Sequence, residues 1–218
     1  MKACIMDFDG LILDTETVWY DIFAKWLMEH HNYRLTVEKF LICVGSHSDA
    51  LFDDLEKNHG TVVDRAAFAR QTKKQFEETV ANMPARDGVP EFIEAVKREG
   101  LKLALATSST LPKPRFHLSR LRLIDKFDAM VTADDVKRIK PHPDLFLLAL
   151  QKLGVTREEV VVIEDSQNGL AAGKNAGLPV IVVPNPVTAN SDFAGAYKKV
   201  ASMRELCIKT LKKEWEKC

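Results

Sequence analysis

Residues that could bind a phosphate and a metal ion stand directly after the apolar runs of this sequence. They are Asp7 and Asp9 after the first run, Thr107, Ser108 and Ser109 after the second, Asp134, Asp135 and Lys140 after the third, and Glu164 and Asp165 after the fourth. Carboxylates brought together repel one another, so they need a compensating positive charge. A divalent cation and Lys140 could supply that charge. An all-oxygen set of ligands that also leaves room for a phosphate favours Mg²⁺.

The elements that would position these residues follow from the apolar runs themselves. The runs lack polar alternation and are bounded by turn residues or charge, which predicts strands buried on both faces. They are residues 3–6, 101–106, 129–131, 160–163 and 179–183. Because ligands bind at the carboxyl ends of parallel strands, the residues that follow the runs would share one edge of the sheet.

Helical patterns lie between the later runs, at 89–99 and 143–153, and a helix packing on the sheet is expected at 169–175. The capping-box pattern at 202–205 predicts the start of a C-terminal helix that runs through about Trp215. Strands alternating with helices predict an α/β fold, a Rossmann-like parallel sheet with helices on both faces.

The first two runs are separated by several times the roughly 10–15 residues of a crossover helix. Purely helical patterns fill this gap, each with Ser, Thr or Asp near its start, at 17–30, 36–40, 48–58 and 64–82. We therefore expect residues 15–85 to form an inserted helical cap domain on two linkers, 13–16 and 83–88. Residues 1–14 and 86–218 would form the α/β core.

The composition excludes several classes of partner. The chain has 31 basic and 31 acidic side chains, so its formal net charge of zero lacks the electrostatic footprint of a nucleic-acid or anionic-membrane binder. The apolar runs are far shorter than the ~20 residues that span a bilayer, and Asp7 interrupts any signal peptide. Scattered cysteines without a Cys-x-x-Cys pair predict reduced thiols, at Cys4, Cys43, Cys207 and Cys218. We expect a cytoplasmic monomer with no nucleic-acid or membrane partner.

Four stretches of the chain together resemble the motifs of the haloacid dehalogenase superfamily of phosphohydrolases. They are DFDGLILDT at 7–15, the strand ending in Thr107, KPHPD at 140–144 and VIEDS at 162–166. The inserted helices resemble the helical cap of the subgroup that includes β-phosphoglucomutase. The resemblance covers nearly the whole chain, and four motifs in order are far more specific than two acids alone.

The resemblance implies a phosphoryl transfer in two steps. Asp7 would attack phosphorus in line and form an aspartyl-phosphate. Asp9 would protonate the leaving oxygen and then take a proton from the attacking water. Thr107 and Lys140 would hold the transferring phosphoryl group, whose equatorial oxygens carry the charge to be stabilised.

The resemblance also implies a ligand set for Mg²⁺. It comprises the carboxylates of Asp7 and Asp165 and the backbone carbonyl of Asp9, with Glu164 as a further ligand, direct or through water. The residues expected to contact the substrate are Glu16, Trp19, His47, Ser108 and Ser109.

The cap region departs from the mutase pattern. Trp19 stands where the mutase has a histidine on its first cap helix, and the segment GSHS at 45–48 lacks the arginine that holds a second phosphate. A single phosphate-binding site favours hydrolysis. The acid at Asp9 argues against the dehalogenase branch, which has no alkoxide to protonate. The phosphonatase branch needs a Schiff-base lysine from the cap; Lys25 and Lys39 are present there, but nothing in the sequence marks either as such a lysine.

The sequence therefore predicts a Mg²⁺-dependent phosphatase acting on a phosphomonoester of a small metabolite, a sugar phosphate or a nucleotide-like compound. Two alternatives stay open. One is a phosphosugar mutase like β-phosphoglucomutase. The other is a non-catalytic phosphate-sensing protein of the same fold, whose mark would be a substitution at Asp7, Asp9 or Lys140, and none of these is substituted.

Overall fold

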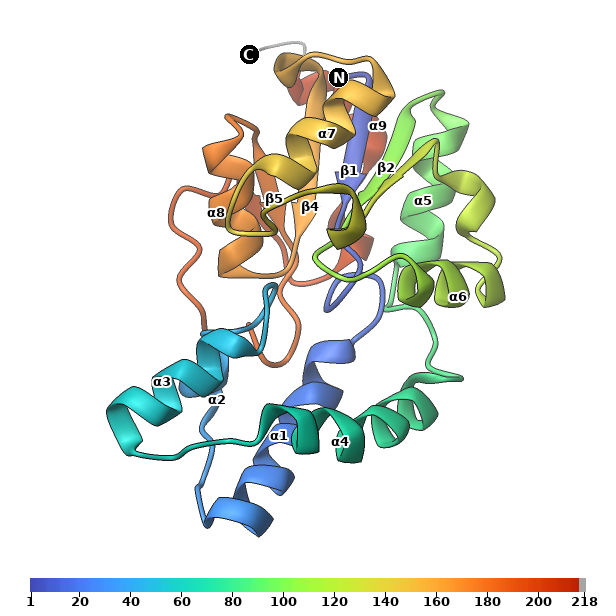
Figure 1. The fold of residues 1–218 in the computed structure, drawn as a ribbon. Coiled ribbons are helices and arrows are strands. Elements are labelled where there is room, and N and C mark those ends of the chain that lie inside the picture. Colours follow the sequence, from blue (N-terminus) through green and yellow to red (C-terminus); the bar gives the residue numbers. More distant parts are fainter. Residues whose placement is uncertain (216–218) are drawn as a thin grey trace.

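The computed structural model describes residues 1–215 as an α/β body with a layer of helices beneath it (Figure 1). Within these residues, six parallel strands form one sheet in the order β3-β2-β1-β4-β5-β6. The strands are β1 (Ala3–Met6), β2 (Lys102–Ala106), β3 (Ala129–Val131), β4 (Val160–Glu164), β5 (Val180–Val182) and β6 (Lys198–Lys199). The predicted α/β fold with a Rossmann-like parallel sheet is confirmed.

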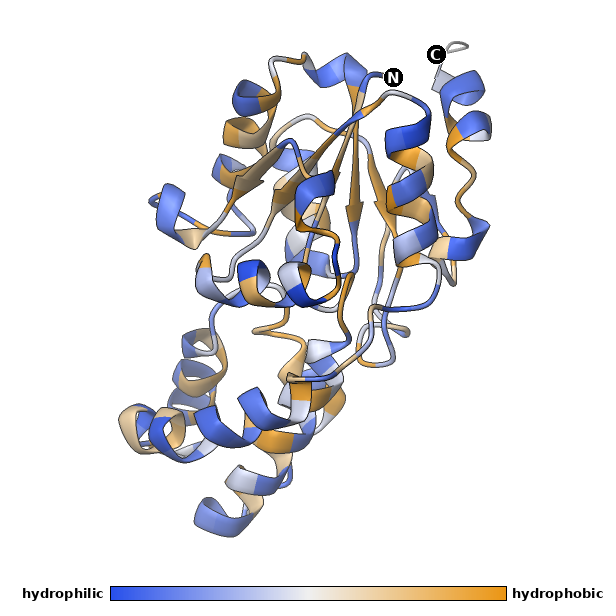
Figure 2. Ribbon diagram, turned by 90° about the vertical axis from the view of Figure 1, so that its right-hand side faces the viewer, coloured by the Kyte–Doolittle hydropathy of each residue, from blue (hydrophilic) through white to orange (hydrophobic). Residues whose placement is uncertain are grey.

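The sheet is apolar on both faces, as the uninterrupted hydrophobic runs predict. In β1, Cys4 and Met6 join the hydrophobic cluster on one face, whereas Ala3 and Ile5 join the cluster on the other. Figure 2 shows the strands in hydrophobic colours between helices with hydrophilic outer faces. Helices α5 (Val89–Arg98) and α9 (Ile208–Trp215) contribute to the first cluster, and α7 (Asp144–Leu153) and α8 (Gln167–Asn175) to the second.

Short elements complete the body. Helix α6 (Pro112–Arg120) follows β2, and the sequence analysis did not predict it. Strand β6 was also missed, because two lysines at the sheet edge carry no apolar signal. Single 3₁₀ turns occur at η1 (Ile124–Lys126), η2 (Ala133–Asp135), η3 (Arg157–Glu159) and η4 (Met203–Glu205).

The predicted C-terminal helix starts later than expected. The capping box of Ser202 and Glu205 forms, but it caps the start of the 3₁₀ turn η4 rather than of an α-helix. Leu206 then takes an extended backbone, with φ −89° and ψ 108°, and α9 begins only at Ile208. Met203 and Leu206 are both buried against the sheet, so the turn and the extended residue together place both side chains in the core.

The inserted segment forms four helices, α1 (Thr15–His31), α2 (Val37–Phe40), α3 (Asp49–His59) and α4 (Arg65–Val80). They share a hydrophobic cluster of their own, in which Phe23 packs against Phe68 with ring centroids 4.4 Å apart. The Asp64 side chain caps α4 by accepting from the Ala67 amide. Helix α1 begins at Thr15, so Glu16 lies in a helical turn rather than in a linker.

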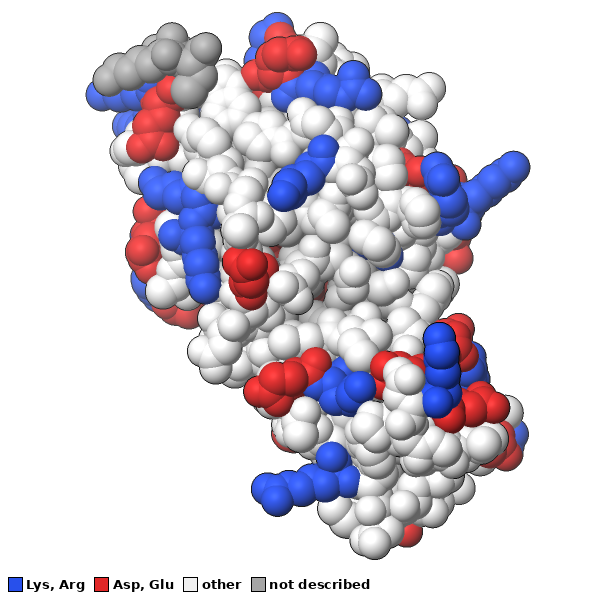
Figure 3. Space-filling view, turned by 90° about the vertical axis from the view of Figure 1, so that its left-hand side faces the viewer, with Lys and Arg blue, Asp and Glu red and all other residues white. Residues whose placement is uncertain are grey.

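Three further properties of the chain bear on its partners and its thiols. Within residues 1–215, no helix combines the length and apolarity needed to cross a membrane. On the face shown in Figure 3, acidic and basic side chains lie interspersed over the body and the helical layer. Cys4, Cys43 and Cys207 are free thiols, and Cys218 lies outside the described residues.

Candidate active site

Asp7 and Asp9 leave the carboxyl end of β1, the central strand where the direction of the strand order reverses. The register pairs Met6 with Leu105 on one side and Ile163 on the other, so Asp7 and Glu164 leave the sheet at the same level. Gly10 makes the exit turn. A Cβ at Gly10 would overlap the carboxylate of Asp165, so the close approach of the two loops requires glycine.

Three buried carboxylates meet at this edge. Asp7, Glu164 and Asp165 each offer one oxygen, and these oxygens all lie within 4.8 Å of one another. Lys140 is 1% exposed, and its Nζ lies 2.6 Å from Asp7 Oδ1 and 2.7 Å from Glu164 Oε1. Burial alone would lower the pKa of Lys140, but the two carboxylates raise it, so the ammonium stays charged.

The cluster carries more negative charge than Lys140 can balance. Burial, and then the charge of Glu164, raise the pKa of Asp7 to about 7, and the same two causes raise the pKa of Asp165 well above its usual range. Asp165 Oδ2 accepts from Asn185 Nδ2 at 2.6 Å, whereas the buried Oδ1 has no hydrogen-bond donor within the described chain. An orphaned carboxylate oxygen inside an acidic cluster suits a hard divalent cation such as Mg²⁺.

Glu164 is the most constrained of the three carboxylates. Its Oε1 meets Lys140, and its Oε2 accepts from the Asp165 amide at 3.1 Å and from Ser166 Oγ at 3.3 Å. A Cβ at Gly169 would overlap this carboxylate, so the first turn of α8 also packs tightly against it. Glu164 therefore orients Lys140 as well as standing in the acidic cluster.

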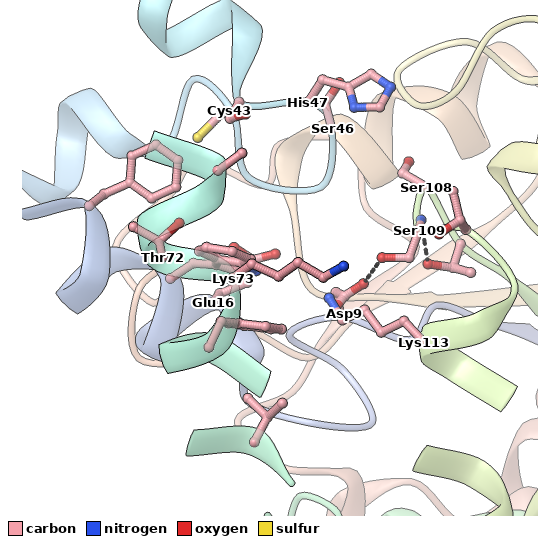
Figure 4. Close-up of a pocket in the computed structure, with 18 of the residues that line it drawn as sticks. Asp9, Glu16, Cys43, Ser46, His47, Thr72, Lys73, Ser108, Ser109 and Lys113 are labelled. Atoms are coloured by element: carbon pink, nitrogen blue, oxygen red, sulfur yellow. Dashed lines mark hydrogen bonds and ion pairs between the residues drawn. The ribbon is translucent and has the colours of Figure 1, made fainter. Parts of the chain in front are cut away.

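Asp9 and Asp7 both line an open cavity, and Figure 4 shows Asp9 there beside Ser109 and Lys113. Asp9 Oδ1 accepts from Thr15 Oγ1 at 2.7 Å and lies 2.5 Å from Lys113 Nζ, and Asp9 Oδ2 accepts from Ser109 Oγ at 2.6 Å. Burial would raise the pKa of Asp9, but Lys113 and the two hydroxyls outweigh burial and lower it.

The residues after β2 line the same cavity. Thr107 is buried, and its Oγ1 accepts from the Ser109 amide at 3.1 Å. Ser108 Oγ donates to the Gly45 carbonyl in the helical layer at 3.0 Å, so this hydroxyl joins the two parts of the chain. The three residues after β2 are therefore together at the site, but Ser108 is already paired.

The cavity has a volume of about 1100 Å³ and lies between the body and the helical layer. Glu16, Trp19 and His47, which the sequence analysis expects to contact the substrate, are among the residues that line it. Trp19 stacks on Phe76 with ring centroids 4.0 Å apart. Burial, and then the charge of Asp9, raise the pKa of Glu16 to about 8.

Two acids of the predicted strand-end set lie elsewhere. Asp134 accepts from the Leu111 amide at 2.8 Å, and Asp135 closes the capping box of η2 and pairs with Lys152 at 3.3 Å. Asp135 is thus used by the 3₁₀ turn after β3 and Asp134 by the residue that precedes α6, so neither belongs to the cluster. The expectation that they follow the strand into the site was wrong.

Lys113 is a site residue that the sequence reasoning missed, as are Asn185, which donates to Asp165, and Thr15, which donates to Asp9. Lys113 lies in the first turn of α6, four residues after Ser109, and its side chain returns over the cavity to Asp9. Pro112 in the first helical turn was an available signal for a helix start. A predicted helix there would have placed Lys113 near the strand end.

This chain is similar to known proteins over most of its length. A family model described as haloacid dehalogenase-like hydrolase matches residues 4–183. The chain is 37% identical over 207 residues to YhcW of Bacillus subtilis (strain 168), with 94% of both chains covered. It is 34% identical over 181 residues to the phosphorylated carbohydrates phosphatase of Thermotoga maritima, with 82% of both covered. The crystal structure of CbbY from Rhodobacter sphaeroides in complex with phosphate matches with a TM-score of 0.77 and 30% identity, covering 94% of this chain and 96% of that chain.

Proposed function

This chain belongs to the haloacid dehalogenase-like hydrolase family and is a phosphatase, and we propose that it hydrolyses small sugar phosphates or related phosphomonoesters with Mg²⁺. The observation that carries the proposal is the placement of the two acids at the end of β1. Asp7 belongs to the buried cluster beside Lys140 and also lines the cavity, where Asp9 lies next to it. A phosphorylated carbohydrate, the substrate class in the name of the Thermotoga protein, would enter from the cavity.

Each residue then has a chemical role. Asp7 attacks phosphorus and forms the aspartyl-phosphate, which splits one displacement into two. Asp9 gives a proton to the leaving oxygen and later accepts one from water. Thr107 holds the phosphoryl oxygens through its hydroxyl, and Lys140 balances their charge.

The metal site is proposed at the acidic cluster. Asp7, Asp165 and the backbone carbonyl of Asp9 hold Mg²⁺, with Glu164 as a ligand directly or through water, and the unpaired Asp165 Oδ1 supports this assignment. When bound, Mg²⁺ supplies positive charge that offsets the carboxylates and the incoming phosphate.

We also propose that residues 15–85 act as a cap on the core formed by residues 1–14 and 86–218. The cavity between the two parts encloses the substrate, and closure excludes water during the first step. Glu16, Trp19, His47 and Ser109 would contact the part of the substrate beyond its phosphate.

The first experiment measures phosphate release from a generic aryl phosphate with Mg²⁺ present and after chelation. Asp7→Asn should abolish turnover while circular dichroism shows an intact fold. Asp134→Asn is the matched control, because it makes the same change in an acid that caps Leu111. Full activity in Asp7→Asn would contradict the mechanism.

A second assay separates hydrolysis from mutase activity. Candidate sugar phosphates are incubated with the enzyme, and free phosphate and isomerised sugar phosphate are both quantified. The lack of an arginine at 45–48 leads us to expect free phosphate. Accumulation of the isomer would favour the mutase, and binding without either product would favour a phosphate sensor.

A further inference from the structure

Lys113 joins the body to the helical layer at the catalytic acid. Its Nζ lies 2.5 Å from Asp9 Oδ1 and 4.9 Å from the ring centroid of Phe76 on α4. Its side chain is 23% exposed, and Figure 4 shows it reaching toward Asp9 from the α6 side of the cavity. The ammonium therefore stands where a substrate enters.

Lys140 provides its positive charge at the nucleophile and is held there. Its side chain is fully buried in ion pairs with Asp7 and Glu164, and it does not line the cavity. A phosphomonoester dianion that enters beside Asp9 meets a carboxylate that already accepts from two hydroxyls, those of Thr15 and Ser109. Lys113 is the ammonium in contact with Asp9, so it can meet the negative charge of the substrate there.

Asp9 does not depend on Lys113 for its orientation. Thr15 Oγ1 and Ser109 Oγ hold one carboxylate oxygen each. Helix α6 is likewise anchored without Lys113, because His117 and Leu118 are buried in the body. Neither Asp9 nor α6 needs Lys113 to hold its position, so the ammonium is free to move to a ligand.

We propose that Lys113 is a catalytic residue, whose ammonium passes from Asp9 Oδ1 to the leaving-group side of the bound phosphomonoester. There it stabilises the negative charge that develops on the leaving oxygen, while the ring of Phe76 supports it from the cap. This role deepens the proposed function and rests on it.

The role predicts a dependence on the leaving group. An alkoxide develops much more negative charge than an acidic phenolate, so the loss of Lys113 should matter most for poor leaving groups. A purely structural role would lower the rate for every ester by the same factor. The two roles are therefore distinguished by a series of esters rather than by a single substrate.

The test compares Lys113→Met, Lys113→Arg and the wild type on aryl phosphates with increasingly basic phenols and on an alkyl phosphate, with Mg²⁺ saturating. Lys113→Met should lower kcat/KM about 10²- to 10³-fold for the alkyl phosphate. The loss should be smaller for the most acidic phenol, and Lys113→Arg should recover part of it. Arg115→Met is the control, since Arg115 is exposed on the same helix and should leave the series unchanged.

Melting temperatures verify that each variant is folded. An equal loss across the ester series, or no loss, in Lys113→Met would overturn the role of Lys113 while wild-type turnover and its abolition in Asp7→Asn uphold the proposed function. Absence of wild-type turnover on every ester would overturn both.

Discussion

Lys140 Nζ and Asp7 Oδ1 lie 2.6 Å apart at a depth where both side chains are almost completely buried. The same ammonium also meets Glu164, so one cation holds two of the three carboxylates of the cluster. Removing one partner of a buried ion pair costs far more stability than replacing both partners with apolar residues, because the remaining charge is left uncompensated. The pair therefore matters to stability and to turnover together.

Lys140→Met should reduce both properties. Without bound cation, we expect the free energy of unfolding to fall by about 3–5 kcal/mol, measured by urea denaturation. Turnover should fall at least about 10²-fold, because the charge beside the nucleophile is lost. Added Mg²⁺ should restore part of the stability, since it supplies positive charge to the same carboxylates.

The matched control for this variant is Lys152→Met. Lys152 pairs with Asp135 near the surface at 3.3 Å, so its loss should cost less than about 1 kcal/mol and leave turnover unchanged. Wild-type turnover in Lys140→Met would show that the buried ammonium takes no part in the reaction.

Mg²⁺ should stabilise the fold through Asp165. A ligand at a hundred times its dissociation constant stabilises a protein by about 2.7 kcal/mol, so Mg²⁺ should raise the melting temperature and chelator should reverse the rise. Asp165→Asn keeps the shape of the side chain but removes the charge of the unpaired Oδ1, and it should abolish most of the shift. Asp134→Asn should retain it. An undiminished shift in Asp165→Asn would place the cation elsewhere.

The parts of the site that follow from strand ends could be predicted from the sequence. Asp7 and Glu164 extend neighbouring parallel strands, so the register alone brings them together. Asp134 and Asp135 follow a strand too, but Asp135 forms the capping box of η2 and Asp134 accepts from the Leu111 amide. That outcome depends on local hydrogen bonds which compete with extension of the strand.

Lys113 could not be placed by the same reasoning. It reaches Asp9 through the length of its side chain and the direction of α6, neither of which is set by the end of β2. The contact with Phe76 further depends on how the helical layer sits over the body. Contacts between the inserted segment and the core carry no periodic signal, which is why the residues that line the cavity were predicted less fully than the cluster.

Glu16 should make stability depend on pH. Its pKa is raised to about 8 in the folded protein, against ~4.3 for an unfolded glutamate. Because the unfolded state ionises at a lower pH than the folded state, the contribution of Glu16 to stability is fully present below about pH 4 and is lost as pH rises through 8. At pH 7 the lost contribution is on the order of 3 kcal/mol.

This contribution can be measured by urea denaturation of wild type and Glu16→Gln between pH 5 and 8 with chelator present. Glutamine cannot ionise, so the variant should lose less stability than wild type as the pH rises. Glu29→Gln, on the exposed side of the same helix, should follow wild type. Parallel curves for Glu16→Gln and wild type would mean that the Glu16 carboxyl is not desolvated.

Gly45 should control closure of the cap over the cavity. Its carbonyl accepts from Ser108, the neighbouring Val44 carbonyl accepts from Asn168 Nδ2 at 2.8 Å, and a Cβ at Gly45 would overlap Ser166 Oγ. Gly45→Ala should therefore push the loop from the body and lower kcat/KM about 10-fold, the equivalent of one lost hydrogen bond.

Gly60→Ala introduces the same methyl at another positive φ but with no atom within 4 Å, so it carries the backbone strain without the clash. If both variants lose activity equally, strain rather than docking of the loop explains the loss, whereas a loss confined to Gly45→Ala assigns it to closure.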